Sequence, residues 1–556
     1  MKTIKKLQLA AAITASLTLM GCGSSSDPVA DVDANQAEGK MASSLLVNST
    51  INTLAAEGYQ VSAPTGTRII NLDADDLAES VRVAFSTIQD GDTIVFPAGY
   101  YSLSTQIKVV GNPLEDGRLK DITIMGAGVN ETIIDFSGLP KGSKGDPDGV
   151  DGLLLSDIDN LVISDLTVAE AGKNAIKVEH INGLHMHHLA TIWDGELVKE
   201  NGAYGIYPVN SENILIENTY TRGSADAGVY VGQSKHVIVR NSVAYENVAG
   251  MEIENCEDAE FYGNIAEKNT AGLLVFDLPI GGGKYGSNVR VYNNVIKDNN
   301  TPNFATVSDF AGGVHIVPHG TGMIVLSTSD VEIFDNDISD HKSFAVAVAD
   351  YGFAESPADL VVFPDQLVDA GLVTQTKYKS VYEDGYSPLV KNITIHDNNI
   401  NNSGYEPDPS KLQDFITLYN LAVPDQPLNT LPEMIYMGLD RTITEIGFPL
   451  GGMGALPLAP WDQTFTEDES VCAYDNTNTA SETVVMGTPY NPFAIAGWEL
   501  DGDGNPVDMN PSPSITEAGF VCGQTRPSLA KTVVTINNVT YGCGTDDTTS
   551  PGCTVN

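Results

Sequence analysis

A short apolar unit, in which two apolar residues flank one other residue, returns every 22 or 23 residues through the middle of the chain. Val229, Met251 and Leu273 begin three consecutive copies at intervals of 22 residues, and a second unit follows eight residues after the start of most copies. Apolar alternation with period two indicates β-strands rather than helices. Strands this short cannot bury a face alone, so the copies must stack on one another as a solenoid.

Asparagines recur at fixed positions of the same repeat. One position holds Asn264, Asn294, Asn336 and Asn398, and another holds Asn247, Asn269 and Asn299. Amides stacked at a turn can hydrogen-bond along the column, although each one alone could also be an ordinary turn residue. The sequence therefore predicts an all-β fold, a right-handed parallel β-helix of roughly nine or ten coils.

The start of the repeat region has the pattern of a capped solenoid end. Residues 74–88 show amphipathic helical spacing, and a helix there would cover the open first coil. This helix, the segment 90–101 that follows it and the segment Asp-Ile-Thr-Ile-Met-Gly-Ala-Gly at 121–128 resemble the start of pectin-lyase-like β-helix proteins. The resemblance extends over residues 68 to about 402.

Four segments of the repeat region resemble a bacterial family of parallel β-helix repeat lipoproteins. They are Gly-Ala-Tyr-Gly-Ile-Tyr-Pro-Val at 202–209, Asp-Ala-Gly-Val-Tyr-Val-Gly-Gln-Ser at 226–234, Ala-Gly-Met-Glu-Ile-Glu-Asn at 249–255 and Val-Phe-Asp-Leu-Pro at 275–279. The resemblance implies a parallel β-helix in the cell envelope. It implies no particular reaction.

The first residues have the chemistry of a lipoprotein signal. A lysine-containing start precedes an apolar run over 7–20 that is too short to span a membrane. The run ends in Leu-Met-Gly-Cys, which resembles the bacterial lipobox and implies that Cys22 is lipidated; the alternative is a signal peptide with an incidental cysteine. Gly23 after the cysteine is typical of outer-membrane sorting. We predict a signal peptide over 1–21, a flexible tether over 22–65 and an outer-membrane lipoprotein that faces the periplasm or the exterior.

Acidic residues dominate the composition. The chain has 29 Lys and Arg residues against 73 Asp and Glu residues, a formal net charge of −44. A surface this acidic repels polyanions, which excludes nucleic acid and a bare anionic membrane as partners. Solubility alone explains the charge, but the acidic surface could also collect Ca²⁺, the one cofactor that the sequence suggests. Neither haem nor a nucleotide is expected.

Six cysteines divide by position. Cys22 carries the lipid, and Cys256 lies alone in the repeat region, where we expect it to be buried. The other four gather near the C-terminus, at Cys472, Cys522, Cys543 and Cys553. In an oxidising compartment they should form two disulfides, and among the three pairings we favour Cys472–Cys522 with Cys543–Cys553. The spacing fits neither covalent haem nor zinc.

The repeat weakens near residue 402, which sets the predicted domains. We predict the β-helix over 66–402 and an irregular, disulfide-stapled subdomain over 403–556 that packs on the last coils. Within this subdomain, residues 501–508 resemble a calcium loop, but Ser512 stands where such a loop carries its bidentate Glu. A solvated turn is the better interpretation of that segment.

Function is expected on the outward face of the first strand of each coil, because alternate side chains of a strand point away from the core. The register predicts a polar and aromatic patch roughly four coils tall, formed by Lys177, Glu179, Tyr207, Tyr230, Glu252 and Glu254. Asp226 enters the patch from the preceding turn, and Gln233, Asn255 and Asp277 edge it from the following turn. The same columns are apolar elsewhere, which predicts covering loops over Leu154, Leu274, Phe276 and Ile324.

Several chemistries fit this patch. In a lyase or epimerase, Glu252 and Glu254 would hold Ca²⁺ or share a proton, and Lys177, Tyr207 or Tyr230 would abstract a proton. In a glycoside hydrolase, Asp226 and Glu252 would be the acid and the base. A non-enzymatic receptor would stack sugar rings on the tyrosines, and a merely solvated sheet face is the remaining alternative. The catalytic candidates are Lys177, Tyr207, Tyr230, Asp226 and Glu252, and the substrate-binding candidates are Glu179, Gln233, Glu254, Asn255 and Asp277.

Specific enzyme signatures are missing. The Asp-Pro-His-Asp of mannuronan epimerases and the Asn-Thr-Asp and Gly-His-Gly of polygalacturonases do not occur. A histidine cluster at 180, 185, 187 and 188 suggests a metal site, but His185 and His187 share one face of a strand while His188 should turn away. We predict a lipoprotein that binds an acidic polysaccharide and processes it by lyase- or epimerase-type proton abstraction. The alternative is a non-catalytic scaffold that docks another secreted protein.

Overall fold

The computed structural model describes residues 65–114, 117–142, 149–307, 312–355, 357–360, 362–363, 365–422, 427–437, 445–446, 456–457, 471–484, 486–487 and 526–542. The predictions for the signal peptide, Cys22, the tether, Cys522, Cys543, Cys553 and the calcium-like segment at 501–508 lie outside these residues. No helix among the described residues has the length and apolar character needed to cross a membrane.

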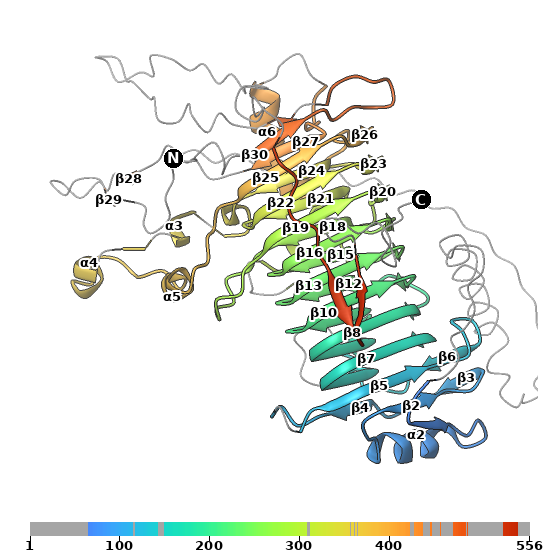
Figure 1. Ribbon diagram of the computed structural model, residues 1–556. Coiled ribbons are helices and arrows are strands. Elements are labelled where there is room, and N and C mark those ends of the chain that lie inside the picture. Colours follow the sequence, from blue (N-terminus) through green and yellow to red (C-terminus); the bar gives the residue numbers. More distant parts are fainter. Residues whose placement is uncertain are drawn as a thin grey trace, which may run out of the picture.

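Each coil is built from three short strands that pair with the same strands of the next coil. β12 (Ala227–Gly232), β13 (Lys235–Arg240) and β14 (Val243–Tyr245) form one coil, and β15 (Ala249–Glu254), β16 (Glu257–Tyr262) and β17 (Ile265–Glu267) form the next. All of their pairings are parallel, with Val229 opposite Met251 and Val237 opposite Ala259. The repeat alignment predicted from the sequence is therefore confirmed, and the coils stack in one column (Figure 1).

The strands form three faces of the solenoid. The first face consists of β4 (Ile107–Val110), the beginnings of β7 (Leu153–Ala169) and β8 (Ile176–Ile192), β9 (Ile206–Val209), β12, β15, β18 (Ala271–Phe276), β21 (Thr321–Leu326), β24 (Phe344–Ala349), β27 (Met434–Met437) and β31 (Met486–Gly487). The second consists of β1 (Arg68–Asn71), β2 (Asp92–Val95), β5 (Leu119–Met125), the middles of β7 and β8, β10 (Glu212–Glu217), β13, β16, β19 (Ser287–Tyr292), β22 (Ser329–Phe334), β25 (Lys391–His396) and β30 (Val471–Tyr474).

The third face consists of β3 (Gly99–Ser102), β6 (Thr132–Asp135), the ends of β7 and β8, β11 (Tyr220–Arg222), β14, β17, β20 (Val295–Lys297), β23 (Asp337–Ser339) and β26 (Asn399–Asn401). Between the faces the chain bends at single residues with positive φ, among them Asn218 at 53° and Asn241 at 50°. Asn and Asp tolerate this left-handed conformation better than most residues, which is why they are common at the corners.

Asparagine ladders run along two corners inside the solenoid. In the first, the amide of Asn264 donates to Asn294 (3.1 Å), and the series continues through Asn336 and Asn398 to Asn476. In the second, the amide of Asn247 donates to Asn269 and that of Asn269 to Asn299, with separations of 3.1 and 2.9 Å. Both predicted columns are confirmed. The structure extends the first column by Asn476, which the sequence analysis did not include.

A helix closes the N-terminal end of the solenoid. α2 (Leu77–Ser86) buries Leu77, Val81, Ala84 and Phe85 against the first coil, as predicted from its amphipathic spacing. At the other end, α6 (Pro409–Ala422) lies beside the last coils (Figure 1).

Strand pairing continues beyond residue 402, where the sequence analysis places the end of the β-helix. β24 pairs with β27 and β25 pairs with β30, and both pairings are parallel. The intervening segments are long, so the repeat spacing in the sequence is lost although the strands still stack. Cys256 is buried and unpaired, as predicted. Cys472 in β30 is disulfide-bonded, and its partner lies outside the described residues, so the pairing remains a prediction.

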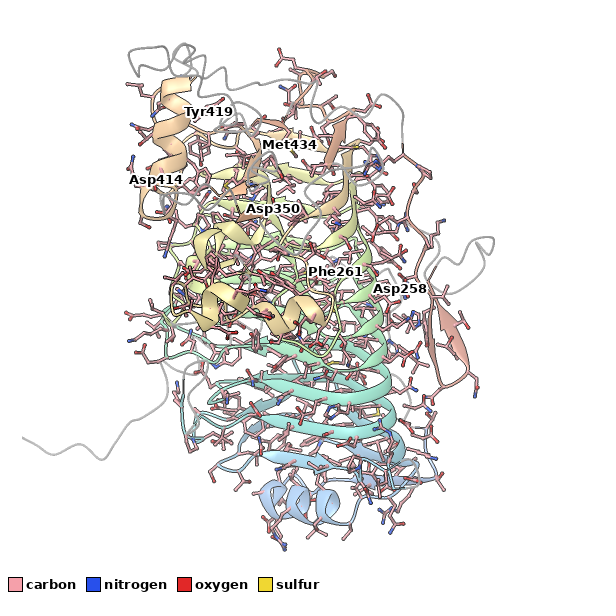
Figure 2. The ribbon with its side chains drawn as sticks, turned by 90° about the vertical axis from the view of Figure 1, so that its left-hand side faces the viewer. Asp258, Phe261, Asp350, Asp414, Tyr419 and Met434 are labelled. Carbon is pink, nitrogen blue, oxygen red and sulfur yellow. The ribbon has the colours of Figure 1, made fainter. Side chains whose placement is uncertain are left out.

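Irregular segments cover the outward side of the first face. They include η1 (Val314–Ile316), η2 (Tyr351–Phe353), α3 (Pro357–Leu360), α4 (Asp365–Asp369) and α5 (Lys379–Glu383). Figure 2 shows the short helices lying over the strands. Leu274, Ile324 and Phe276 form one apolar cluster with residues of these covering segments. This confirms the prediction of covering loops over these three residues. Leu154, closer to the N-terminus, stays half-buried.

The C-terminal segment 526–542 forms a strap along the second face. It contains the antiparallel hairpin of β32 (Val534–Ile536) and β33 (Val539–Tyr541), while β28 (Glu445–Ile446) and β29 (Leu456–Pro457) form a separate pair. The strap begins beside the late coils, where Arg526 donates to Asn392, and runs back to Asn160 in an early coil (Figure 1). The prediction that the C-terminal subdomain packs on the last coils is wrong for this segment, because the strap packs on apolar residues of β10, β13, β16 and β19.

Candidate functional site

The predicted patch on the first face is assembled as the register requires. Lys177 lies opposite Tyr207 between β8 and β9, and Tyr230 lies opposite Glu252 between β12 and β15. The rings of Tyr207 and Tyr230 meet edge to face with centroids 4.9 Å apart. Tyr204, which the sequence analysis did not select, packs on both rings at 4.5 and 4.7 Å. Its place in a turn, outside the strand pattern, is why periodicity gave no sign of it.

Most of this patch is buried. Asp226 is 0%, Glu252 2% and Glu254 8% exposed, and Tyr230 is 3% exposed. The alternative of a solvated sheet face is therefore wrong for these residues, because the segments over the first face exclude water from them.

Lys177, Glu179 and Tyr207 are the part of the patch that remains half-buried. Lys177 Nζ forms an ion pair with Glu179 Oε2 at 2.8 Å and lies 5.7 Å from the centre of the Tyr207 ring. This edge of the patch is the portion that a ligand could reach without any movement of the covering segments.

A small cavity separates the buried carboxylates from the covering segments. Asp226, Glu252 and Glu254 line one side, and apolar residues, including Val314 and Val317, line the other. Its volume of about 50 Å³ is far below the roughly 300 Å³ at which ligand pockets begin, and it has room for a few waters at most. A sugar ring cannot reach these carboxylates while the covering segments stay in place.

The buried tyrosines are protonated at neutral pH. Burial, together with the charge of Glu254, raises the pKa of Tyr230 well above its ordinary value of 10.0. Burial and the charge of Asp226 do the same for the pKa of Tyr204. A phenol in this state donates hydrogen bonds, which argues against the predicted role of Tyr230 as a proton-abstracting base.

Three of the predicted substrate-binding residues have structural partners instead. The Asn255 amide donates to the backbone oxygens of Leu278 and Lys284 and accepts from the Leu278 N–H. Both carboxylate oxygens of Asp277 accept the Gly286 N–H, at 2.8 and 2.9 Å. These two side chains hold the loop 278–286 in place. Gln233 donates to Tyr230 and to Glu254 Oε1.

A larger groove, which we call the corner groove, runs along the bend between the first and second faces. Its volume is about 430 Å³, and its walls include Arg118, His180, Lys235 and Lys284 as well as the carboxylates of Glu212 and Glu257. Lys284 Nζ reaches Asn210 Oδ1 at 3.1 Å, while Arg118 and Lys235 also pair with carboxylates. Sequence reasoning missed the groove, because its basic residues come from the ends of strands and from a loop that lie far apart in the sequence. A usable signal was the polar residue at each corner, as at His180, Asn210, Gln233 and Asn255.

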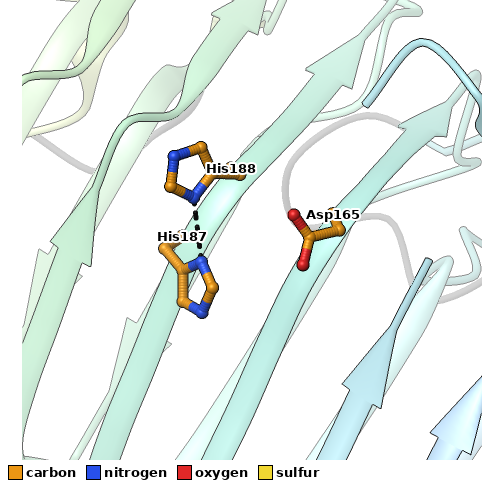
Figure 3. A group of neighbouring side chains, drawn as sticks. All are labelled: Asp165, His187 and His188. Atoms are coloured by element: carbon orange, nitrogen blue, oxygen red, sulfur yellow. Dashed lines mark hydrogen bonds between the residues drawn. The ribbon is translucent and has the colours of Figure 1, made fainter. Parts of the chain in front are cut away.

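The histidines at 185, 187 and 188 lie on the second face and at its corner, away from the patch. His188 has a φ of 49°, which breaks the strand alternation and turns its ring towards His187 (Figure 3). The prediction that His188 turns away is therefore wrong. Among the described residues, the group of three His, Cys, Asp or Glu side chains that could hold a metal is Asp165, His187 and His188. Calcium at Glu252 and Glu254 remains a prediction.

Burial shifts the pKa values of this group. It lowers the pKa of His187 to about 3 and that of His188 to about 4. It raises the pKa of Asp165 to about 7. Both imidazoles are therefore neutral at neutral pH, with a ring nitrogen lone pair available to a ligand.

Comparisons with known proteins agree with the fold. Residues 151–356 match the family described as right handed beta helix region. The A-module of mannuronan C-5 epimerase AlgE4 of Azotobacter vinelandii is similar in structure with 17% identity and a TM-score of 0.33, over 64% of this chain and 89% of that one. The alginate lyase of Paenibacillus sp. str. FPU-7 has 15% identity and a TM-score of 0.31, over 51% and 93%. No curated protein matches the chain.

These structural similarities are distant and carry no argument about chemistry. The family match and the observed strand register stand without them. The central part of the chain, residues 151–356, is a right-handed β-helix region, the fold that the resemblance to pectin-lyase-like proteins implies.

Proposed function

We propose that this protein is a cell-envelope lipoprotein that binds an acidic polysaccharide in the corner groove. The observation that carries the proposal is the charge of the groove. The chain has a net charge of −44, yet Arg118, Lys235 and Lys284 line one groove of about 430 Å³. Glu212 and Glu257 line the same groove, so its positive side chains outnumber its carboxylates by one. Basic side chains gathered in a cleft attract anions, even on a protein whose overall charge repels them.

The shape of the groove suits a linear polymer. Its floor contains corner residues of successive coils, including His180, Asn210 and Gln233. Neighbouring coils are about 4.8 Å apart, so a polymer lying across them meets a similar polar side chain at each coil. Amide and ammonium groups hydrogen-bond sugar hydroxyls and carboxylates without requiring a closed pocket.

Binding is better supported than processing. The carboxylates that a lyase, epimerase or hydrolase would use face a cavity of about 50 Å³, and Tyr230 is held as a neutral phenol. Proton abstraction at Glu252 or Tyr230 therefore requires that the loop 278–286 and the segment around Val314 move apart. Mannuronan and alginate are linear polymers with one carboxylate per sugar, which is the chemistry that the groove would bind, so these polymers should be tested first.

Calorimetric titration of the chain lacking residues 1–22 with mannuronan and alginate oligosaccharides tests the proposal. We expect the double variant Lys235→Ala, Lys284→Ala to bind at least tenfold more weakly than the wild type, and added salt to weaken wild-type binding. Lys199→Ala is the matched control, because Lys199 is an exposed lysine outside the groove. Equal affinity of the double variant and the wild type would reject the corner groove. A rise in ultraviolet absorbance from unsaturated uronates during the titration would establish lyase activity in addition.

Anchoring to the outer membrane is a separate part of the proposal. Lipidation of Cys22 would place the β-helix at the outer membrane through a tether of about 40 residues. Cys22→Ser should release the protein from the membrane fraction of the producing cell and abolish labelling with a palmitate analogue. Retention of the variant in the membrane fraction would show that another segment anchors the chain.

A further inference from the structure

Asp165, His187 and His188 come together because of the solenoid register. Ser164 of β7 lies opposite His187 of β8, so Asp165 and His188 occupy the same corner position in adjacent coils. Their φ angles are 61° and 49°, and this left-handed conformation carries both side chains to the side on which His187 lies. Figure 3 shows the Asp165 carboxylate pointing towards the two imidazoles.

The distances suit a shared ion. His187 Nδ1 and His188 Nδ1 are 2.9 Å apart, and one ligand atom of each of the three residues lies within 4.8 Å of the others. In a tetrahedral zinc site, two ligand atoms about 2.1 Å from the ion lie about 3.4 Å apart. To bind an ion, the two nitrogens would separate by about 0.5 Å, and the other ligand distances would shorten by at most about 1.4 Å.

A hydrogen bond between the two imidazoles is the simplest explanation of their contact, but it does not account for Asp165. This carboxylate is 0% exposed. Its Oδ2 accepts the Ser164 hydroxyl at 2.7 Å, whereas no hydrogen-bond donor in the described part of the chain reaches its Oδ1. A buried carboxylate oxygen without a partner costs folding free energy. A cation bound by all three side chains removes that cost.

The sequence at this corner also departs from its neighbours. Following coils place Asn218, Asn241, Gly263 and Asn293 at the position of His188, all with positive φ. Turn geometry alone is thus satisfied by Asn or Gly. A second imidazole beside His187 adds a metal ligand that the turn does not need.

An ion has a route to the group from solvent. A groove of about 330 Å³ is lined by Ser164, His187, Thr67, Asp121 and, from the C-terminal strap, Asn537. His187 and His188 are each 9% exposed, so they are nearly but not completely closed off.

We infer that Asp165, His187 and His188 form a binding site for a divalent transition-metal ion, with Zn²⁺ as the first probe. Two imidazoles and one carboxylate suit Zn²⁺, Ni²⁺ or Cu²⁺, whereas Ca²⁺ and Mg²⁺ prefer oxygen ligands. Three protein ligands leave at least one coordination position for water. The site lies at the bend between the second and third faces, whereas the corner groove lies at the bend between the first and second faces, so the site does not depend on polysaccharide binding.

The test is titration of the chelator-treated chain lacking residues 1–22 with ZnCl₂, NiCl₂ and CaCl₂, followed by calorimetry and by elemental analysis after gel filtration. We expect one Zn²⁺ per chain and no Ca²⁺ at this site. Loss of a hydrogen-bond partner outside the ligand shell typically lowers metal affinity 10–100-fold. Removal of a ligand in His187→Ala or His188→Ala should therefore lower the Zn²⁺ affinity by at least about a hundredfold.

Two variants separate loss of a ligand from loss of folding. His188→Asn supplies the side chain that Asn218 provides at the equivalent corner, so it should fold and still lose Zn²⁺. His236→Ala removes a histidine of β13, beside Asp258, and should bind Zn²⁺ like the wild type. Zinc X-ray absorption should show two imidazole ligands in the wild type. A wild type that takes up no Zn²⁺, or a His188→Asn variant with unchanged affinity, would overturn the inference.

Discussion

Asn294 donates its side-chain amide to Asn336 Oδ1 at 2.9 Å, and the same oxygen accepts the backbone N–H of Asn294 at 3.0 Å. This double contact repeats from coil to coil, so each asparagine satisfies the buried backbone and side chain of its neighbour. These contacts replace water, which is excluded from the interior corner, and the Asn294 amide also donates to the Phe261 backbone oxygen at 2.9 Å.

The ladder predicts a large cost for removing one member. Asn294→Ala leaves the Asn264 N–H and amide without their acceptor, and each buried unsatisfied group costs about 1–3 kcal/mol. We expect the free energy of unfolding, measured by urea denaturation, to fall by about 3 kcal/mol or more. Asn399→Ala is the control, because the hydrogen bond from the Asn399 side-chain amide to Asp337 is exposed and should contribute less than about 1 kcal/mol. Similar losses in both variants would contradict the role given to the ladder.

The buried ion pair of Glu217 predicts a pH-dependent effect. Burial alone would raise the pKa of Glu217, but the His185 hydrogen bond and the Arg240 charge outweigh it and lower this pKa from 4.5 to about 2. The stability that Glu217 contributes is thus present above about pH 4.5 and is lost as the pH falls towards about 2.

Arg240→Leu leaves Glu217 without its main cation. Breaking a buried pair in this way costs about 3–5 kcal/mol, so the free energy of unfolding near pH 7 should fall by about that amount. The difference in free energy of unfolding between variant and wild type should become smaller as the pH falls below about 4.5. Urea denaturation at several pH values measures this difference. The double variant Arg240→Leu, Glu217→Gln should recover part of the loss. A difference that does not change with pH would mean that packing, and not charge, sets the cost.

Asp277 makes the loop 278–286 sensitive to pH. Burial raises the pKa of Asp277 from 3.8 to about 7, although the Gly286 N–H and the Thr328 hydroxyl lower it. A raised pKa in the folded state means that the stabilising contribution is complete below about pH 4 and is lost as the pH rises through about 7. After correction for intrinsic exchange, amide hydrogens of 278–286 should exchange faster at pH 8 than at pH 6. The Asn side chain in Asp277→Asn cannot ionise, so this variant should show the same exchange rate at both pH values. A pH dependence that persists in this variant would mean that another group causes it.

The C-terminal strap should detach without unfolding the coils. Val534 is 0% exposed and packs with Leu215 and Ile238 of the second face. Val534→Asp buries a charge at this contact, which is costly, so trypsin should cut faster after Lys531 while the far-ultraviolet circular dichroism stays unchanged. Thr535→Asp places the same charge at the exposed residue next to Val534, and trypsin should cut this variant at the same rate as the wild type. Loss of β-structure in Val534→Asp would show instead that the strap is needed for the coils.

The sequence by itself determined the solenoid, its register and its asparagine ladders. These features depend on spacing alone: a repeat of 22 residues puts Val229 over Met251 and Tyr230 over Glu252 in any stack of coils. It also brought together the residues of the predicted patch, because outward positions follow from strand alternation.

Only the tertiary structure decided which of these outward residues meet solvent. Glu252 and Glu254 are covered by segments around Val314 and the loop 278–286, and the second face is covered by residues 526–542. These segments have no periodic pattern, so their positions depend on long-range packing that spacing does not encode. The left-handed φ of His188 is a further case, since one corner residue overrides strand alternation and creates the group with Asp165 and His187.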